Sequence, residues 1–428
     1  MMMHHHVAAC AAFFLATLVS APVGAQNTDQ PPIADRLKAA AQENRLTLDY
    51  DGQKFSGPAW EALLAEGRNA HFFLLGEEHG IAENPKLAAA LFAALIPAGY
   101  TKIAIEVSPP MARELDRAAA DGGVEGLARL FAQPGGVPAF FGMKEEAEWL
   151  AAARAAAPPN EPLFWGADYE VGGDRLLVRL LEGKRKPAAA KTALADLKAA
   201  QEASWAKFAE TKSPQYIFTF SGDPALVRAV KDAWPKRDAD AAWSLDTLEE
   251  TLEINKLWVS RQGYASNERR SAFMRANFIR HWQAEKKSGR APKAFAKFGA
   301  SHLVRGRNSS EVFDLGALLP EIAALEGGRT FHLLVLPGAG AMTAVFNPME
   351  WTYSPAPAKD GYAAGLAPII GEAFPDAFTL IDLRPMRPIL GRARADTDPE
   401  LMRIVHGFDA VLVMSGSTAS ANFLSDEP

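Results

Sequence analysis

Short apolar runs recur along the chain, and each is bounded by glycine, proline or polar residues. The apolar character within each run is nearly continuous rather than alternating, which is typical of strands buried on both faces of a parallel sheet. Seven runs predict strands in this way, over residues 70–75, 102–107, 163–167, 294–298, 331–336, 378–383 and 409–414. We therefore expect an α/β fold with a mixed, largely parallel central sheet flanked by helices.

Helical patterns lie between these runs. Residues 86–96 predict a helix, because three leucines recur at intervals of four residues on one face. Together with the strands on either side, residues 70–107 follow the plan of a β-α-β unit with short loops. Residues 143–156 predict a second helix before the strand at 163–167.

Residues 172–290 differ from the rest, because they are rich in Ala, Lys, Glu and Leu at helical spacing. The pattern is clearest over residues 187–211, 224–234 and 244–287, whereas residues 216–220 fit either a strand or a helix. Parallel strands need long crossover connections, so a crossover can be enlarged by additional helices without a change in the sheet. We expect residues 172–290 to be a helical insertion between the two parts of the α/β core, residues 46–171 and 291–428.

The first 25 residues have the layout of a secretory signal peptide. An apolar stretch over residues 7–19 is followed by Pro22 and by a small-x-small pattern that ends at Ala25. The alternative is a membrane anchor, but the apolar stretch is too short to span a bilayer comfortably. We expect cleavage after Ala25, a polar leader over residues 26–45, a periplasmic or secreted protein, and no transmembrane span in the mature chain.

Composition and charge argue against several classes of function. The net charge is −6 and the sequence pI is about 5.9, which argue against a general nucleic-acid binder. The single cysteine, Cys10, lies in the expected signal peptide, so the mature chain would have no disulfide, no thiolate zinc ligand and no cysteine nucleophile. The expected partner is a small-molecule or peptide substrate.

Two segments of the type Gly-x-x-His follow predicted strands. Gly76-Glu77-Glu78-His79 follows the strand at 70–75, and Gly299-Ala300-Ser301-His302 follows the strand at 294–298. Ligands bind at the carboxyl ends of strands in open α/β sheets. The simpler interpretation of each segment is a solvated loop that caps the next helix, but the repeated plan favours one shared site.

Three further residues are candidates for that site. Glu106 and Asp168 each end an apolar strand, where a carboxylate is costly unless it is paired, protonated or bound to a metal. The alternative for each is an ion pair with an arginine of the core. Arg270 lies on a dense helical segment, where it either reaches the site to hold a carboxylate or phosphate or belongs to an ordinary solvated face.

Imidazole and carboxylate ligands together suit Zn, Mn, Co or Fe. We expect His79, His302, Glu106 and Asp168 as ligands of a divalent transition metal, which would lower the pKa of a bound water. A second carboxylate of the Glu77–Glu78 pair could then act as general base.

These residues resemble a known group of proteins. The string Leu74-Leu75-Gly76-Glu77-Glu78-His79 resembles the Leu-Leu-Gly-Glu-x-His of ChaN-like proteins, in the superfamily that also includes erythromycin esterases and the TraB/Tiki proteins. Ala104-Ile105-Glu106, Gly299 to His302, and Arg270 with Met274 match further motifs of that superfamily, although Ser271 stands where Asn or Asp is usual. The resemblance covers about residues 65–305 and implies a mixed α/β fold with a helical insertion.

The members of this superfamily differ in activity. Tiki-like members are divalent-metal proteases, erythromycin esterases open macrolide lactones, and ChaN-like members bind haem. The first hypothesis is therefore an exported metal-assisted hydrolase of a peptide or ester bond, with Glu77, Glu78, Glu106 and Arg270 in catalysis. The alternatives are a haem-binding protein with His79 or His302 as axial ligand, and a scaffold without chemistry.

Overall fold

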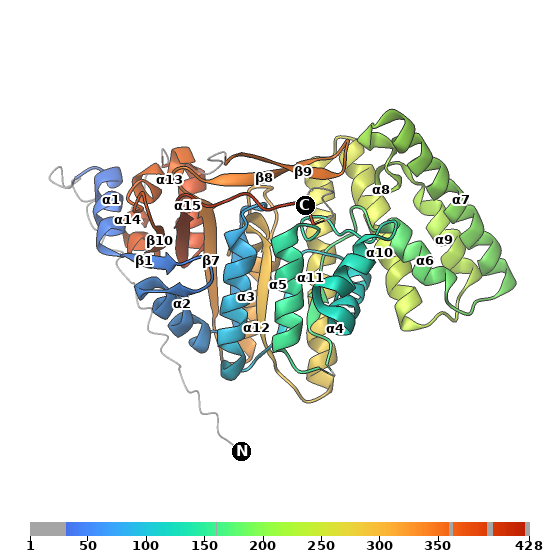
Figure 1. Ribbon diagram of the computed structural model, residues 1–428, viewed down its shortest axis with the longest axis horizontal. Helices are drawn as coiled ribbons and strands as arrows, with labels where there is room; N and C mark the ends of the chain where they lie inside the picture. Colours follow the sequence, from blue (N-terminus) through green and yellow to red (C-terminus); the bar gives the residue numbers. More distant parts are fainter. Residues whose placement is uncertain (1–30, 160, 359–362, 392–396, 424–428) are drawn as a thin grey trace, which may run out of the picture. The chain divides into compact units, whose positions relative to one another are not determined.

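A mixed sheet forms the centre of the molecule (Figure 1). In the described residues its nine strands lie in the order β2-β1-β10-β11-β7-β3-β6-β4-β5. The six strands from β11 to β5 are all parallel, whereas β10 is antiparallel to both β11 and β1. The strands are β1 Arg45–Tyr50, β2 Phe55–Ser56, β3 Phe72–Glu77, β4 Tyr100–Ile105, β5 Phe164–Gly166, β6 Lys293–Gly299, β7 Thr330–Pro337, β10 Phe378–Asp382 and β11 Ala410–Met414.

The computed structural model describes residues 31–159, 161–358, 363–391 and 397–423. The signal peptide expected over residues 1–25 lies outside these ranges. Each of the seven predicted strands is present in the sheet within a few residues of its predicted bounds. The predicted largely parallel sheet is therefore confirmed.

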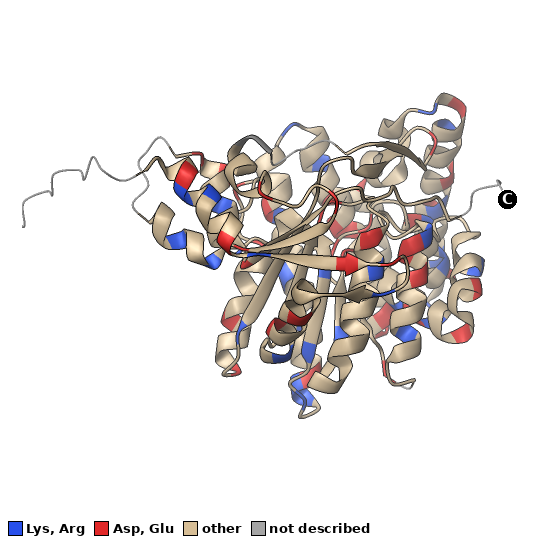
Figure 2. Cartoon of the chain, turned by 60° about the vertical axis from the view of Figure 1, so that its left-hand side comes forward, with Lys and Arg blue, Asp and Glu red and all other residues tan. Residues whose placement is uncertain are grey.

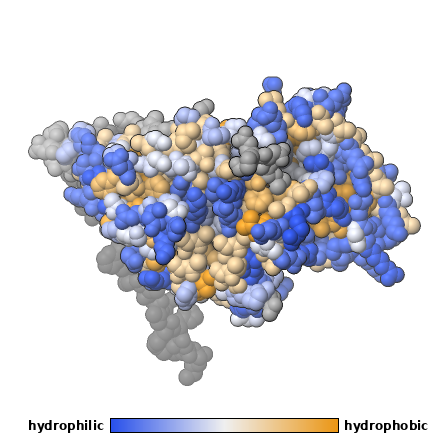
Figure 3. All heavy atoms as spheres, viewed as in Figure 1, coloured by the Kyte–Doolittle hydropathy of each residue, from blue (hydrophilic) through white to orange (hydrophobic). Residues whose placement is uncertain are grey.

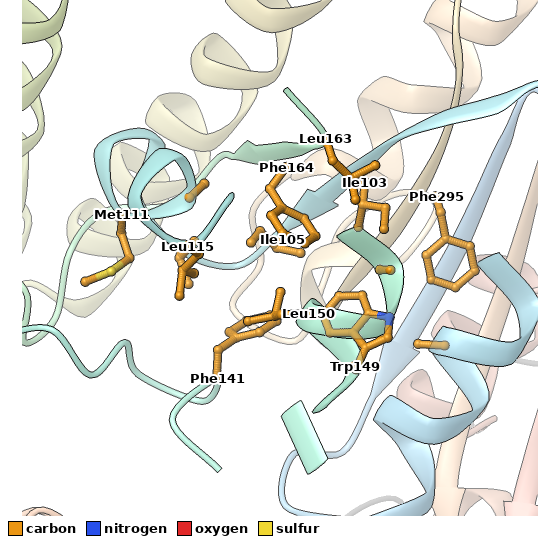
Figure 4. Packing of buried hydrophobic residues seen from close by; sticks show 14 of the residues in the cluster. Ile103, Ile105, Met111, Leu115, Phe141, Trp149, Leu150, Leu163, Phe164 and Phe295 are labelled. Carbon is orange, nitrogen blue, oxygen red and sulfur yellow. The ribbon is translucent and has the colours of Figure 1, made fainter. Parts of the chain in front are cut away.

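Both faces of the parallel strands are buried, which explains their continuous apolar sequences. Phe73 and Leu75 of β3 point into one cluster of core residues, and Phe72 and Leu74 point into another on the opposite face. Figure 4 shows the first cluster around Ile105 and its neighbours. That face is covered by α2 Pro58–Asn69, α3 Glu83–Leu95, α4 Pro109–Phe131 and α5 Lys144–Ala156.

The opposite face is covered by the first helix of the described chain and by helices from its second half. They are α1 Ile33–Glu43, α11 Gly263–Lys287, α12 Leu315–Leu325, α13 Ala363–Ile370, α14 Arg387–Leu390 and α15 Pro399–Gly407. Helix α1 corrects the expected polar leader over residues 26–45. Leu37 and Ala41 of α1 are fully buried against this face, so the amphipathic spacing of a short segment outweighs its polar composition.

The β-α-β unit expected over residues 70–107 has an additional strand. Helix α3 connects β3 to β4 as predicted, but β6 pairs with both and lies between them. The sequence pattern did not predict β1, β2 or the separate hairpin of β8 Met342–Asn347 and β9 Thr352–Pro357. Strand β2 has only two residues, and β1, β8 and β9 lie near the sheet edge or outside the sheet and are partly exposed, so these strands lack a continuous apolar run.

The predicted helical insertion contains helices joined by turns and loops, and no strand, in its described residues. It comprises α6 Asp174–Glu182, α7 Ala188–Thr211, α8 Phe218–Ser221, α9 Pro224–Ala233, α10 Ala239–Val259 and the first part of α11. Residues 216–220, which could have been a strand, belong to a 3-10 turn and to α8. Helix α11 returns to the core, where Phe278 packs edge-on against Phe72 of β3.

The β8–β9 hairpin crosses from the sheet to the helical insertion (Figure 1). Near its tip, Trp351 packs edge-on against Trp205 and Phe208 of α7, with ring centroids 5.9 Å and 6.4 Å away. At the other end, the Ala344 N–H of β8 donates to the carbonyl of Gly80 in the loop after β3. The hairpin therefore connects the insertion with the carboxyl edge of the sheet.

The surface carries charges of both signs. In the view of Figure 2, Lys and Arg alternate with Asp and Glu along the helices. Figure 3 shows that the outer part of the helical insertion is mostly hydrophilic on the face drawn. Among the described residues, we find no helix with both the length and the apolar character that crossing a membrane requires.

We predict that Trp351→Ala detaches the hairpin tip without unfolding the core. The lost aromatic contacts correspond to at least about 1.4 kcal/mol, so amide hydrogen exchange in β8 and β9 should become about tenfold faster. Mass spectrometry of the exchanged peptides measures this. Met349→Ala, at an exposed position of the same hairpin, is the matched control, and equal exchange in both variants would contradict the assigned role of Trp351.

Candidate functional site

Four neighbouring strands each contribute a polar residue at their carboxyl ends. In the sheet these strands are β3, β6, β4 and β5. His79 follows β3, and Glu106 directly follows β4. His302 lies in the 3-10 turn Ala300–Leu303 after β6, and Asp168 lies two residues beyond β5. Because the strands are parallel, all four side chains reach the same edge of the sheet, as predicted for one shared site.

Glu106 is at the centre of this group. Its Oε2 accepts a hydrogen bond from the Gly299 N–H at 2.6 Å, and its Oε1 accepts one from Arg270 Nη2 at 3.0 Å. The Nε2 atoms of His79 and His302 lie 3.5 Å and 3.3 Å from Oε2 and Oε1. Each carboxylate oxygen therefore faces two N–H groups, which satisfies all of its acceptor positions.

Each imidazole is oriented by a second, buried carboxylate. His79 Nδ1 donates to Glu77 Oε1 at 3.0 Å, and His302 Nδ1 donates to Asp314 Oδ2 at 2.7 Å. A partner on Nδ1 fixes the ring and directs Nε2 toward the site. Asp314 is itself held as the N-cap of α12, where its Oδ1 accepts from the Leu315 N–H.

Arg270 reaches the site from α11. Of the two interpretations of its helical segment, the one in which it holds a carboxylate therefore agrees with the structure, and the solvated face does not. Its Nε and Nη2 donate to the two oxygens of Asp168 at 3.0 Å and 2.5 Å. For Asp168, the structure thus agrees with the ion-pair alternative. No described residue accepts a hydrogen bond from Arg270 Nη1, and the guanidinium lies 4.8 Å from the centre of the Tyr169 ring.

The two motif glycines allow close approach between the two segments. A Cβ on Gly299 would lie 2.9 Å from His79 Nε2 and 3.3 Å from Glu106 Oε2. A Cβ on Gly76 would lie 3.1 Å from the Cα of Ala300. Neither glycine has a positive φ. Glycine is therefore needed at both positions because a side chain would not fit, and not because the backbone makes a sharp turn.

The pKa values of both imidazoles are raised. Burial alone would lower the pKa of His79, but hydrogen bonding and charge from Glu106 and Glu77 raise it to about 10. Burial and Arg270 lower the pKa of His302, and Glu106 and Asp314 raise it to about 9. Burial would raise the pKa of Glu106, yet the charges of the two histidines hold it well below its usual value. Both imidazoles are therefore cationic at neutral pH.

The cations form the accessible surface of the site. The side chains of His79, Arg270 and His302 are between 11% and 23% exposed. The carboxylates beneath them are only 1% to 4% exposed. A molecule that enters the site therefore meets N–H donors first.

The expected metal site does not match this arrangement. Among the described residues, no group of three or more His, Cys, Asp or Glu side chains is placed to hold a metal ion. In this arrangement the oxygens of Glu106 face N–H groups and Asp168 is paired with Arg270, so neither carboxylate is free to bind a metal. For the haem alternative, the Nε2 atom that would be the axial ligand lies 3.5 Å from Glu106 in His79 and 3.3 Å from it in His302.

The Glu77–Glu78 pair separates into two environments. Glu77 is the last residue of β3 and is buried beneath His79. Successive strand residues point to opposite sides, and the Glu78 carboxylate makes no hydrogen bond or ion pair with the described residues. Burial raises the pKa of Glu78, and its predicted role as general base stays a prediction.

Sequence reasoning missed three buried residues behind the imidazoles: Asp314, Lys297 and Glu146. Lys297 donates to both Glu77 Oε1 and Glu146 Oε1 at 2.6 Å. One signal was available, because Lys297 interrupts the apolar run at 294–298 and lysine is rarely buried unless it is paired. For Asp314 the only signal was its place before an apolar helix.

Phe140 covers the outer side of His79. The two rings are stacked with centroids 4.2 Å apart and an interplanar angle of 8°. Phe140 has a φ of 62°, which is uncommon for a residue with a side chain, and its N–H donates to the Tyr353 hydroxyl of β9. The loop before α5 and the β8–β9 hairpin together thus hold this ring on the imidazole.

Two further histidines, His332 and His281, have structural contacts. His332 is fully buried and donates from Nδ1 to the Leu303 carbonyl. His281 donates to the Gly166 carbonyl and stacks on Trp165. Burial lowers the pKa of both, so each is neutral at pH 7.

Comparison with known proteins gives the fold. No protein-family model matches the sequence, and no curated protein matches it. A variant of the erythromycin esterase EreC in its open conformation is 16% identical with a TM-score of 0.59, over 87% of this chain and 98% of EreC. A protein from Bacillus cereus is 15% identical with a TM-score of 0.55, over 92% and 100% of the two chains.

The predicted resemblance is confirmed at the level of the fold. The chain has a mixed α/β architecture similar to that of the EreC structure, with a mostly parallel sheet flanked by helices. The haem-binding ChaN of Campylobacter jejuni is 10% identical over 69% of this chain and 91% of ChaN. Its TM-score of 0.26 is too low to support an argument.

We predict that Gly299→Ala disturbs the site while the fold persists. The added Cβ would push the His79 ring away from Glu106, so the pKa of His79 should fall from about 10 toward its ordinary value. A histidine NMR titration measures this pKa. Gly183→Ala is the matched control, because a Cβ there meets no atom closer than 3.7 Å. An unchanged His79 pKa in Gly299→Ala would show that the contact is unimportant.

Proposed function

We propose that this protein is a hydrolase that opens an ester bond with water activated by one of two paired histidines. The observation that carries the proposal is the arrangement of His79 and His302, which are both oriented by buried carboxylates and both face Glu106. The fold shared with an erythromycin esterase supports an ester as the substrate.

The paired imidazoles can divide the roles of base and acid. When one of them has lost its Nε2 proton, it can take a proton from water while the water oxygen forms a bond to the acyl carbon. The carbonyl electron pair moves onto the acyl oxygen. The tetrahedral intermediate then expels the alkoxide, which takes the proton back from the imidazolium, and an acid and an alcohol are released.

The developing charge on the acyl oxygen needs N–H donors. Arg270 Nη1 supplies them, because its N–H groups have no acceptor among the described residues. The other imidazole remains protonated beside Glu106 and adds positive charge to the site. Donors that are already in place stabilise an oxyanion more effectively than water does. Asp168 and Glu106 hold the guanidinium in position from the buried side.

This proposal replaces the metal-assisted mechanism expected from the sequence. The protonated imidazole and the guanidinium supply the positive charge that a metal would supply in the expected mechanism. The proposed substrate is a small molecule with an ester or lactone bond. We also propose export, which the pattern of residues 1–25 supports.

The first experiment is a screen of 4-nitrophenyl esters and lactones with purified protein, with and without EDTA. We expect hydrolysis that EDTA leaves unchanged and that Glu106→Gln lowers in kcat/KM by about a hundredfold or more. The matched control is Glu170→Gln, at a buried carboxylate near the site that faces Ser108 and Gly173 instead. It should retain activity.

Each outcome of this screen decides between the alternatives. No turnover of any ester would contradict the proposed function. Loss of turnover with EDTA and its return with Mn, Co or Zn would restore the metal-assisted mechanism. A visible absorption band on addition of haem, lost in His79→Ala, would favour the haem-binding alternative instead.

The pH dependence of hydrolysis follows from the raised histidine pKa values. A general base must be neutral, and His302 and His79 lose their protons only as the pH rises toward about 9 and about 10. We therefore expect kcat/KM to rise about tenfold per pH unit between pH 6.5 and 8.5. A rate that is flat or falls over this range would show that neither imidazole is the base.

A further inference from the structure

A buried lysine lies directly behind the first motif. Lys297 is in the interior of β6, where it pairs with Leu75 of β3 and Ile105 of β4, and it is only 1% exposed. A lone ammonium at such a position would be strongly destabilising. Its contacts therefore indicate why a lysine is present in an otherwise apolar strand.

Lys297 connects two carboxylates on the side of the sheet covered by α5. Its Nζ donates at 2.6 Å to Glu77 Oε1, the same oxygen that accepts from His79 Nδ1. It also donates at 2.6 Å to Glu146 Oε1 of α5. The result is a continuous chain of polar contacts from the imidazole, through Glu77 and Lys297, to Glu146.

The surroundings keep Lys297 charged. Burial would lower its pKa, but the negative charges of Glu146 and Glu77 outweigh that effect and raise it. The Phe141 and Trp149 rings lie 5.0 Å and 5.2 Å from Nζ, within the range of cation–π attraction. These partners also determine where Nζ lies, because they surround it on several sides.

Glu77 depends on Lys297 to remain in place. Its side chain is 1% exposed, and its second oxygen, Oε2, has no hydrogen-bond partner among the described residues. All of its polar contacts thus converge on Oε1, from Lys297 and His79. Without the ammonium, a fully buried carboxylate would retain one weaker partner, and it would protonate or turn away.

We propose that Lys297 is a positioning residue for the proposed hydrolysis: it holds Glu77 directed at Nδ1 of His79, which keeps the His79 ring in place with Nε2 beside Glu106. Glu146 fixes Lys297 from the other side. Lys297 touches neither water nor substrate, and it acts only through Glu77. Among the described residues no lysine contacts Asp314, the carboxylate of His302, which instead accepts from the Leu315 N–H at the N-terminus of α12. The two imidazoles are therefore supported by different means.

The test compares Lys297→Met with wild type by NMR of labelled histidine. The hydrogen-bonded Nδ1–H proton of His79 should exchange with water at least about tenfold faster in the variant, because its charged acceptor is no longer held. The Nδ1–H proton of His302 is the internal control and should change little. This measurement needs no substrate, so it is independent of whether an ester is hydrolysed.

Lys102→Met is the matched control for loss of a buried lysine. Lys102 lies in the neighbouring strand β4, is also 1% exposed, and pairs with Glu285 and the Pro162 carbonyl away from the site. It should leave the His79 proton unchanged. If Lys297→Met does not fold, Glu146→Gln, which removes one charge that holds Lys297, should accelerate the same exchange by a smaller factor.

The outcomes are distinct. Faster exchange of the Nδ1–H proton at His79 but not at His302 supports the proposal. If an ester is hydrolysed, Lys297→Met should also lower kcat with little change in KM. Unchanged exchange in a folded Lys297→Met protein overturns it, as would equal acceleration at His79 and His302. If wild type hydrolyses no ester but the His79 proton responds as expected, the proposed function fails while the positioning of His79 by Lys297 stands.

Discussion

The buried carboxylate of Glu106 is the constraint on which the site depends. A charged group at the end of an apolar strand is tolerated only when donors surround it, and the chain supplies four of them, from His79, Gly299, His302 and Arg270. Removal of one partner from a buried ion pair costs about 3–5 kcal/mol. The same contacts that make Glu106 tolerable therefore bring together the loop after β3, the end of β6 and helix α11.

The strand order makes this convergence possible. Strand β6 follows the helical insertion in sequence, yet it lies between β3 and β4 in the sheet. That placement puts Gly299 and His302 beside His79 and Glu106, although more than 190 residues separate the two motifs in the chain. The insertion also supplies α11, so Arg270 can approach from the open side of the same edge.

Charge in the site is arranged in layers. Carboxylates lie beneath, cations lie above them, and Lys297 provides a further buried cation behind Glu77. This order explains why the pKa values of the histidines rise despite burial. In the sequence, the histidines and carboxylates together suggest a metal centre. In the structure these carboxylates form ion pairs instead, because an arginine and two protonated imidazoles lie beside them.

The sequence by itself determined the strands, the helical insertion and the two Gly-x-x-His segments, because buried strands and amphipathic helices leave periodic patterns. It also singled out Glu106, since a carboxylate in an apolar run is costly wherever the strand lies. Only the tertiary structure decided that Arg270 binds Asp168, that Glu77 rather than Glu78 orients His79, and that Lys297 and Asp314 support the imidazoles. The physical reason is that these contacts join strands and helices that are distant in the chain, and their pairing depends on the order in which the sheet assembles.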